Sequence, residues 1–237
     1  MTERLTSHRW LGQCIDAHQG FLPLETFMEL ALFDPHFGYY TKQIRGVGPN
    51  GDFSTSASLS RLLGRAVAQW ALNEHRKFHG GRFRWNLIEI GGGTGALAHS
   101  ILTNLPLLSR LGCRFHIVEI SPRLQQMQKK TLARHSVIWH TTMSNALESC
   151  QGEATIISNE LLDTFPCMQF IFHENRWKVV GLTRDSEGII SESFRDIQKQ
   201  REKAAFDLIA ISPDTEKSGR RHEIQWSIRD WIQGWVP

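Results

Sequence analysis

A run of glycines follows a short apolar segment and could bring the backbone close to a ligand. Residues 86–90 read NLIEI, and the next five residues are Gly91, Gly92, Gly93, Thr94 and Gly95. Glycine lets the chain turn tightly and approach a bound molecule because no Cβ stands in the way. The apolar run is typical of a buried parallel strand, and residues 96–105 have helical spacing. A glycine loop between a strand and a helix indicates a nucleotide cofactor.

Two acidic residues bear on which cofactor this loop would hold. Glu119 ends the next apolar run, where a carboxylate can accept hydrogen bonds from ribose hydroxyls, as NAD and S-adenosylmethionine (SAM) both require. Glu89 stands just before the glycines, where it would repel a diphosphate but suit the cationic sulfonium and ammonium groups of SAM. The loop followed by Ala96 also fits the dinucleotide fingerprint, and Glu89 could instead only cap the loop. The residues alone do not decide between NAD and SAM as the cofactor.

A short polar segment follows the fourth apolar run. It contains Asn159, Glu160 and Asp163, and a helical turn would present the two carboxylates on one face. Two carboxylates can hold a planar guanidinium through paired hydrogen bonds and aim one nitrogen at a reacting carbon. We therefore predict that these three residues are catalytic. An ordinary acidic helix start is the alternative interpretation.

The surrounding pattern predicts the elements that position these residues. Apolar runs expected to be strands alternate with helical segments, which favours an α/β fold with a doubly wound parallel sheet. The four expected strands lie at 86–90, 114–121, 137–142 and 154–161. Ligands of such sheets bind at the carboxyl ends of the strands. An antiparallel meander is expected to be inserted at about 166–195, because three short apolar runs there are separated by turn residues.

The N-terminal part predicts a helical extension. Helices are expected at 24–33 and from Leu59 to Trp70, with a short strand at 38–41 and a loop rich in glycine and serine at 44–58. A last helix would carry Ile224 and Ile228 on its apolar face. We therefore expect an extension with a cofactor-covering loop at 1–80, and the cofactor-binding core with its insertion at 81–237.

Composition excludes several classes of protein. The 237 residues are 41% hydrophobic and 22% charged with a net charge of +3, a globular balance with scattered basic residues that does not indicate nucleic-acid binding. The four cysteines form no Cys-x-x-Cys pair and the histidines have no ligand spacing, so no metal site is expected. No apolar run approaches the roughly 18 residues of a membrane span. The N-terminus lacks an apolar signal core, and a cytoplasmic location is the default expectation.

Five segments, in this order, resemble the MidA family of SAM-dependent methyltransferases. They are FMELALFDPHFGYYT, GPNGDFSTS, IEIGGGTGAL, VEISPRLQQMQ and SNELLDTFPCMQF. The resemblance implies a class I methyltransferase (Rossmann-like) fold, in which Gly91, Gly93 and Gly95 line SAM and Glu119 binds its ribose. It also implies that the segment around Asp52 closes over the pocket.

The resemblance carries further expectations about the substrate. Eukaryotic members of the family are mitochondrial proteins of respiratory complex I assembly, described as protein arginine methyltransferases. A protein substrate is therefore implied, with an arginine guanidinium as acceptor and a complex I subunit as a candidate. Two departures from the family pattern are Gly92, where a proline is usual, and the leucine pair Leu161–Leu162, where aromatic residues are usual.

We therefore expect a SAM-dependent methyltransferase acting on a protein side chain. The alternatives are a SAM-binding assembly factor with little turnover and a NAD(P)-dependent oxidoreductase, although the two tyrosines, Tyr39 and Tyr40, form no Tyr-x-x-x-Lys pair. Chains of the family continue well past this point. We accordingly expect a shortened sheet that lacks its last strands, with the fourth strand at its edge, and weak or no turnover.

Overall fold

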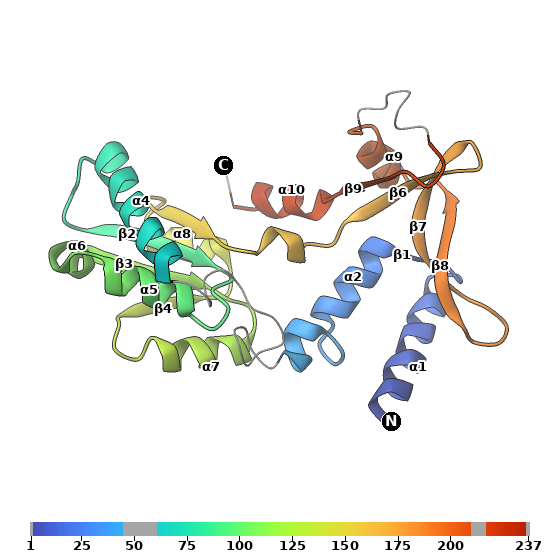
Figure 1. Ribbon diagram of the computed structural model, residues 1–237, viewed down its shortest axis with the longest axis horizontal. Helices are drawn as coiled ribbons and strands as arrows, with labels where there is room; N and C mark the ends of the chain where they lie inside the picture. Colours follow the sequence, from blue (N-terminus) through green and yellow to red (C-terminus); the bar gives the residue numbers. More distant parts are fainter. Residues whose placement is uncertain (1, 45–60, 210–216, 236–237) are drawn as a thin grey trace. The chain divides into compact units, whose positions relative to one another are not determined.

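The computed structural model describes residues 2–44, 61–209 and 217–235 and is shown in Figure 1. The chain forms two compact units, which are described separately. Unit 1 combines Met1–Lys42 with Thr164–Pro237, and unit 2 is the continuous stretch Gln43–Asp163. The predicted division into a helical extension at 1–80 and a cofactor-binding core at 81–237 stays a prediction.

Unit 2 contains the predicted parallel sheet. Its strands are β2 (Trp85–Ile90), β3 (Cys113–Val118), β4 (Val137–His140) and β5 (Thr155–Ser158), in the order β4-β3-β2-β5. Ile90 pairs with Val118 on one side and with Ser158 on the other, so the carboxyl ends of the three strands are level. Among the described residues β5 is an edge strand of this sheet, as expected.

Five helices in the described part of unit 2 accompany this sheet. They are α4 (Arg61–His79), α5 (Ala96–Asn104), α6 (Leu107–Gly112), α7 (Pro122–Thr131) and α8 (Met143–Ser149). The Ser121 hydroxyl caps α7 by accepting from the Leu124 N–H, and Pro122 occupies the first turn, as the sequence predicts. The main core joins β2 and β3 to α4 and α5, and its fully buried side chains include Leu87, Ile101 and Phe115.

Unit 1 is built on an antiparallel sheet. Its strands are β1 (Leu22–Pro23), β6 (Met168–His173), β7 (Arg176–Arg184), β8 (Ile190–Asp196) and β9 (Arg221–Ile224). The predicted meander is confirmed as β6, β7 and β8. The helices are α1 (Thr2–Ala17), α2 (Leu24–Phe33), α9 (Gln200–Phe206) and α10 (Trp226–Gln233), and the core gathers around Phe170 and Val179.

Two sequence-based element predictions are wrong in unit 1. The expected strand at 38–41 is a π-helical turn, η1 (Tyr39–Gln43), and the Thr41 hydroxyl donates to the Asp34 carbonyl at 2.5 Å. That local hydrogen bond stabilises a turn where aromatic residues suggested a strand. The last helix was expected to include Ile224, which instead ends β9 and pairs with Met168. The strand pairing in this sheet overrides the helical spacing.

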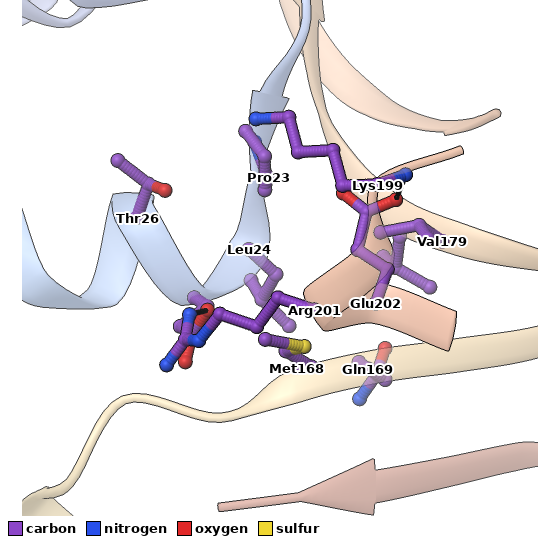
Figure 2. A pocket seen from close by; sticks show the side chains of 11 residues that line it. Pro23, Leu24, Thr26, Met168, Gln169, Val179, Lys199, Arg201 and Glu202 are labelled. Carbon is purple, nitrogen blue, oxygen red and sulfur yellow. Dashed lines mark hydrogen bonds and ion pairs between the residues drawn. The ribbon is translucent and has the colours of Figure 1, made fainter. Parts of the chain in front are cut away.

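Unit 1 contains a pocket of about 170 Å³ that none of the predicted site residues line. Side chains of α2, β6 and α9 line it, as Figure 2 shows. Ion pairs involve three of its charged side chains: Arg201 donates to Glu25 at 2.6 Å, and Arg195 donates to both carboxylate oxygens of Glu202. These pairs join α9 to α2 and β8 and are structural.

Membrane-spanning helices and metal-ligand groups were searched for in the described residues. No helix in residues 2–44, 61–209 and 217–235 is long and apolar enough to cross a bilayer. In the same ranges, no three His, Cys, Asp or Glu side chains are grouped so that they could hold a metal ion.

Candidate cofactor site

The glycine loop joins β2 to α5 at the carboxyl edge of the parallel sheet. Gly91, Gly93 and Gly95 have φ values of +67°, +53° and +84°, which side chains with a Cβ rarely adopt. The Gly91 N–H donates to the Val118 carbonyl at 3.0 Å, and the Gly95 N–H donates to the Gly92 carbonyl at 2.8 Å. A Cβ on Gly95 would lie 3.3 Å from the Cα of Gln128. The loop is therefore a fixed turn whose conformation and packing both favour glycine.

Glu89 is buried next to this loop. Glu89 is only 2% exposed, and its Oε2 atom has no hydrogen-bond partner among the described residues. A Cβ on Gly92 would lie 3.4 Å from that oxygen. Burial, and then the charge of Glu119, raise the pKa of Glu89 to about 8. An unpartnered buried carboxyl costs free energy, and a bound cation or hydrogen-bond donor at the loop would recover it.

Glu119 lies directly after β3 and is held in a defined orientation. Its Oε1 accepts from the Ser121 N–H at 2.9 Å, and its Oε2 accepts from Gln128 Nε2 at 3.0 Å. Burial raises the pKa of Glu119, although these hydrogen bonds oppose the shift. A carboxylate has about four acceptor positions, so these two hydrogen bonds leave positions that could accept from ribose hydroxyls.

Gln128 is a residue of the candidate site that the sequence analysis missed. Besides Glu119, its Nε2 donates to the Gly93 carbonyl at 3.0 Å, and its Oε1 accepts from Trp139 Nε1 at 2.9 Å. The residue is fully buried on α7. It therefore connects the glycine loop, the acid after β3 and strand β4, and acts as a positioning residue. A glutamine on the buried face of a predicted helix was the available signal, because buried amides need partners.

Ile120 is a second residue that sequence reasoning missed. It follows Glu119 and is 60% exposed. A large apolar side chain beside an acid that could hold ribose suits contact with the flat face of a nucleobase. The sequence contained this apolar position, but only the structure shows that it is not part of the core.

The acidic segment differs from the predicted helical turn. Glu160 has a left-handed backbone, with φ of +52°, and precedes the short 3-10 turn η2 (Leu162–Thr164), so no helical turn includes both Glu160 and Asp163. The expectation that one helical face presents both carboxylates is therefore wrong. Leu161 nevertheless lies against the glycine loop, because a Cβ on Gly91 would lie 2.8 Å from Leu161 Cδ1.

The segment thus lies beside the glycine loop, and its carboxylates are exposed. Glu160 and Asp163 are both exposed, and Asn159 is half-buried. Their catalytic roles stay a prediction, as do the cofactor contacts of the glycines, Glu89 and Glu119. Asp52, expected to help cover the pocket, lies outside the described residues.

Comparison with known proteins decides the family. Residues 66–236 match the model of a family described as S-adenosyl-L-methionine-dependent methyltransferases. This chain belongs to that family. The finding confirms the resemblance drawn from the five sequence segments, and SAM is the cofactor of the family. The oxidoreductase alternative is not favoured.

Curated relatives support the same assignment. The mitochondrial protein arginine methyltransferase NDUFAF7 homologue of Drosophila melanogaster is 26% identical over 231 residues, which cover 87% of this chain and 52% of that protein. The mitochondrial protein arginine methyltransferase NDUFAF7 of Danio rerio is 26% identical over 193 residues, or 71% of this chain and 44% of that protein. The chain therefore spans about half the length of these relatives.

A solved structure has the same fold. A COG1565 superfamily member from Burkholderia thailandensis, bound to S-adenosyl-homocysteine, has a TM-score of 0.76 at 24% identity. The match covers 95% of this chain and 57% of that protein. The predicted methyltransferase-type α/β fold is thereby confirmed.

Replacing Glu119 by alanine is expected to weaken SAM binding by about 1–3 kcal/mol, the usual effect of losing a charged hydrogen-bond partner. Isothermal titration calorimetry with SAM would measure the change. Glu153, an exposed acid paired with Arg82 at 3.4 Å, offers a matched control in the same unit. If Glu119→Ala and Glu153→Ala bound SAM equally well, Glu119 would not contact the cofactor.

Proposed function

We propose that this chain binds SAM at the glycine loop and transfers its methyl group to a protein side chain. The observation that carries the proposal is the buried, unpartnered Oε2 of Glu89 near the end of β2, beside Gly92, together with Glu119 directly after β3. A bound cation favours the ionised form of Glu89, and that carboxylate would repel a diphosphate. The donor set therefore fits SAM, whose sulfonium supplies an electrophilic methyl group when it is bound.

The chain's own residues would bind and orient the reactants. The loop backbone offers N–H groups at the start of α5, Glu119 would accept from ribose hydroxyls, and Gln128 holds both in place. Methyl transfer is an in-line displacement, so most of the catalysis comes from holding donor and acceptor in register. A buried network that fixes the loop against the acid serves that purpose.

An arginine guanidinium is the acceptor that we propose. Its support is the name of the Drosophila melanogaster and Danio rerio relatives, protein arginine methyltransferase, together with the carboxylates of Glu160 and Asp163 next to the loop. Carboxylates that bind a guanidinium keep its positive charge on the nitrogens away from the reacting one. The MidA resemblance makes a respiratory complex I subunit a candidate substrate.

The cellular location stays a prediction. A cytoplasmic location was the default expectation from the N-terminal sequence, whereas the named relatives are mitochondrial. Organelle fractionation of cells that express the chain would decide between the two.

A SAM-binding assembly factor with little turnover was the alternative drawn from the sequence. The comparisons do not favour it, because the matched family and the named relatives are methyltransferases.

Two measurements test these proposals in order. Titration calorimetry with SAM and with NADH should show binding of SAM only. Transfer of a labelled methyl group from SAM to candidate protein substrates, with the methylated atom located by mass spectrometry, then distinguishes an enzyme from a binding protein. Binding of NADH in place of SAM would refute the cofactor assignment, and binding of SAM without transfer would leave the assembly factor.

Glu160→Gln and Asp163→Asn are expected to lower methyl transfer about tenfold or more while SAM affinity stays within about twofold of wild type. The reason is that the two carboxylates would contact the acceptor and not the cofactor. Steady-state rates and SAM titrations on the same preparations would measure both quantities. Unchanged rates in both variants would contradict the acceptor role.

A further inference from the structure

Helix α6 exposes its apolar side chains. Leu107, Leu108 and Leu111 are 61%, 71% and 66% exposed, although an ordinary surface helix turns such residues inward. The inner face of α6 carries small residues instead. The Ser109 carbonyl accepts from Trp85 Nε1 at 2.9 Å, and a Cβ on Gly112 would lie 1.8 Å from the Phe83 carbonyl oxygen. This close packing against backbone fixes the helix with its leucines outward.

Two phenylalanines extend this apolar surface. Phe83 is 59% exposed and follows the turn before β2, and Phe78 is 66% exposed near the end of α4. Both segments are fixed, because His75 Nε2 lies 2.7 Å from the Arg82 carbonyl oxygen and the His75 ring stacks on Trp85.

We call these five side chains the apolar patch. Its members are Phe78, Phe83, Leu107, Leu108 and Leu111. Its segments lie at the end of the sheet where β2 and β3 begin, as Figure 1 shows for α6. The glycine loop lies at the opposite, carboxyl end of the same strands. The patch is therefore separate from the candidate cofactor site.

Basic residues are concentrated in the segments that carry the apolar patch. The two segments that carry it, 74–84 and 106–114, contain six arginines and lysines and a single acid, Glu74. The basic residues are Arg76, Lys77, Arg82, Arg84, Arg110 and Arg114. The whole chain is nearly balanced, with 27 basic and 24 acidic residues, so the excess here is local. Glu153, which pairs with Arg82, lies outside both segments.

We propose that the apolar patch docks on an anionic phospholipid surface. Its leucines and phenylalanines protrude from a helix and a turn, and the boundary between headgroups and acyl chains accepts such side chains without a complementary pocket. The arginines of the two segments and Lys77 would contact lipid phosphates. Strands β2 and β3 run away from the patch, so the glycine loop would face the aqueous side. A protein with an acidic amphipathic helix would need a groove matched to these side chains.

The experiment uses the whole 237-residue chain and sedimentation with vesicles. Vesicles of phosphatidylcholine mixed with phosphatidylglycerol should bind the chain, and binding to phosphatidylcholine alone should be about tenfold weaker or more. Leu107, Leu108 and Leu111 changed together to serine should reduce the partition coefficient about tenfold or more, because the apolar area is lost. Arg76→Gln and Arg84→Gln should each reduce it about fivefold at low salt.

A matched control separates the patch from exposed apolar side chains in general. Ile189, 57% exposed in the turn between β7 and β8, should be replaceable by serine without loss of vesicle binding. Circular dichroism of each variant confirms that it folds.

Three results would overturn the proposal. They are wild-type chain that stays in the supernatant with anionic vesicles, equal binding by the serine variant, and concentration-dependent dimerisation that the serine substitutions abolish. The last outcome would assign the patch to a second copy of the chain.

Discussion

The Glu89→Gln variant is expected to become progressively more stable than wild type as the pH rises from 4.5 to about 8. Glu89 has a pKa of about 8 in the folded chain and its ordinary value of 4.5 when unfolded. Folding takes up a proton between these values, so the free energy of unfolding of the wild type falls as pH rises. The loss is about 1.4 kcal/mol per pH unit and stops near the folded pKa. Because glutamine does not titrate, the variant lacks this pH-dependent fall in the free energy of unfolding.

Urea unfolding of both proteins across that range would measure the difference. Other titrating groups cancel in the comparison, because they are present in both proteins. A difference that stays constant with pH would contradict the assignment of the raised pKa to Glu89.

The same substitution is expected to weaken SAM binding. A bound sulfonium favours the ionised carboxylate, so SAM binding to wild type should release a proton at neutral pH. Calorimetry in buffers of different ionisation enthalpy detects that proton. Equal proton release by wild type and Glu89→Gln would show that Glu89 does not face the cofactor.

Gly93→Val is expected to abolish SAM binding. Gly93 has φ of +53°, where a β-branched residue costs about 1–2 kcal/mol, and its side chain would stand in the loop that holds the ligand. The thermal stabilisation that SAM gives to wild type should disappear in the variant, because a ligand stabilises only a protein that binds it. Thermal unfolding with and without SAM measures this.

Gly152→Val provides the matched control in the same unit. Gly152 has φ of +77°, and a Cβ there would meet nothing within 4 Å. The control should suffer similar backbone strain but keep its stabilisation by SAM. If both variants lost the stabilisation equally, strain alone would account for the effect of Gly93→Val.

The parallel sheet and its glycine loop could be predicted because their determinants are local. Each strand is a short apolar run bounded by turn residues, and the Ser121–Pro122 pair marks the start of α7 by a local hydrogen bond. Glu119 was recognised for the same reason, because an acid that ends a buried strand must lie at the carboxyl edge of the sheet.

The remaining features depend on contacts between distant segments. Strand β9 exists because Arg221–Ile224 pairs with β6, about fifty residues earlier, and no local pattern encodes that register. Gln128 has three partners from three elements, which become visible only when α7 packs on the loop. Glu160 takes a left-handed backbone conformation just after β5, so sequence spacing could not predict its orientation.

The pairing of β1 with β7 has a consequence for how the chain folds during synthesis. Leu22 pairs with Leu182, and the whole of unit 2 lies between them in sequence. The N-terminal helices therefore leave the ribosome long before their partner strand exists, whereas unit 2 is continuous and can fold as soon as it emerges. Once unit 2 has folded, the distance between its two ends is fixed. The two separate segments of unit 1 then lose less conformational entropy when they come together. Unit 1 therefore forms after unit 2, and its N-terminal helices stay without their partner strand until β7 (Arg176–Arg184) has been synthesised.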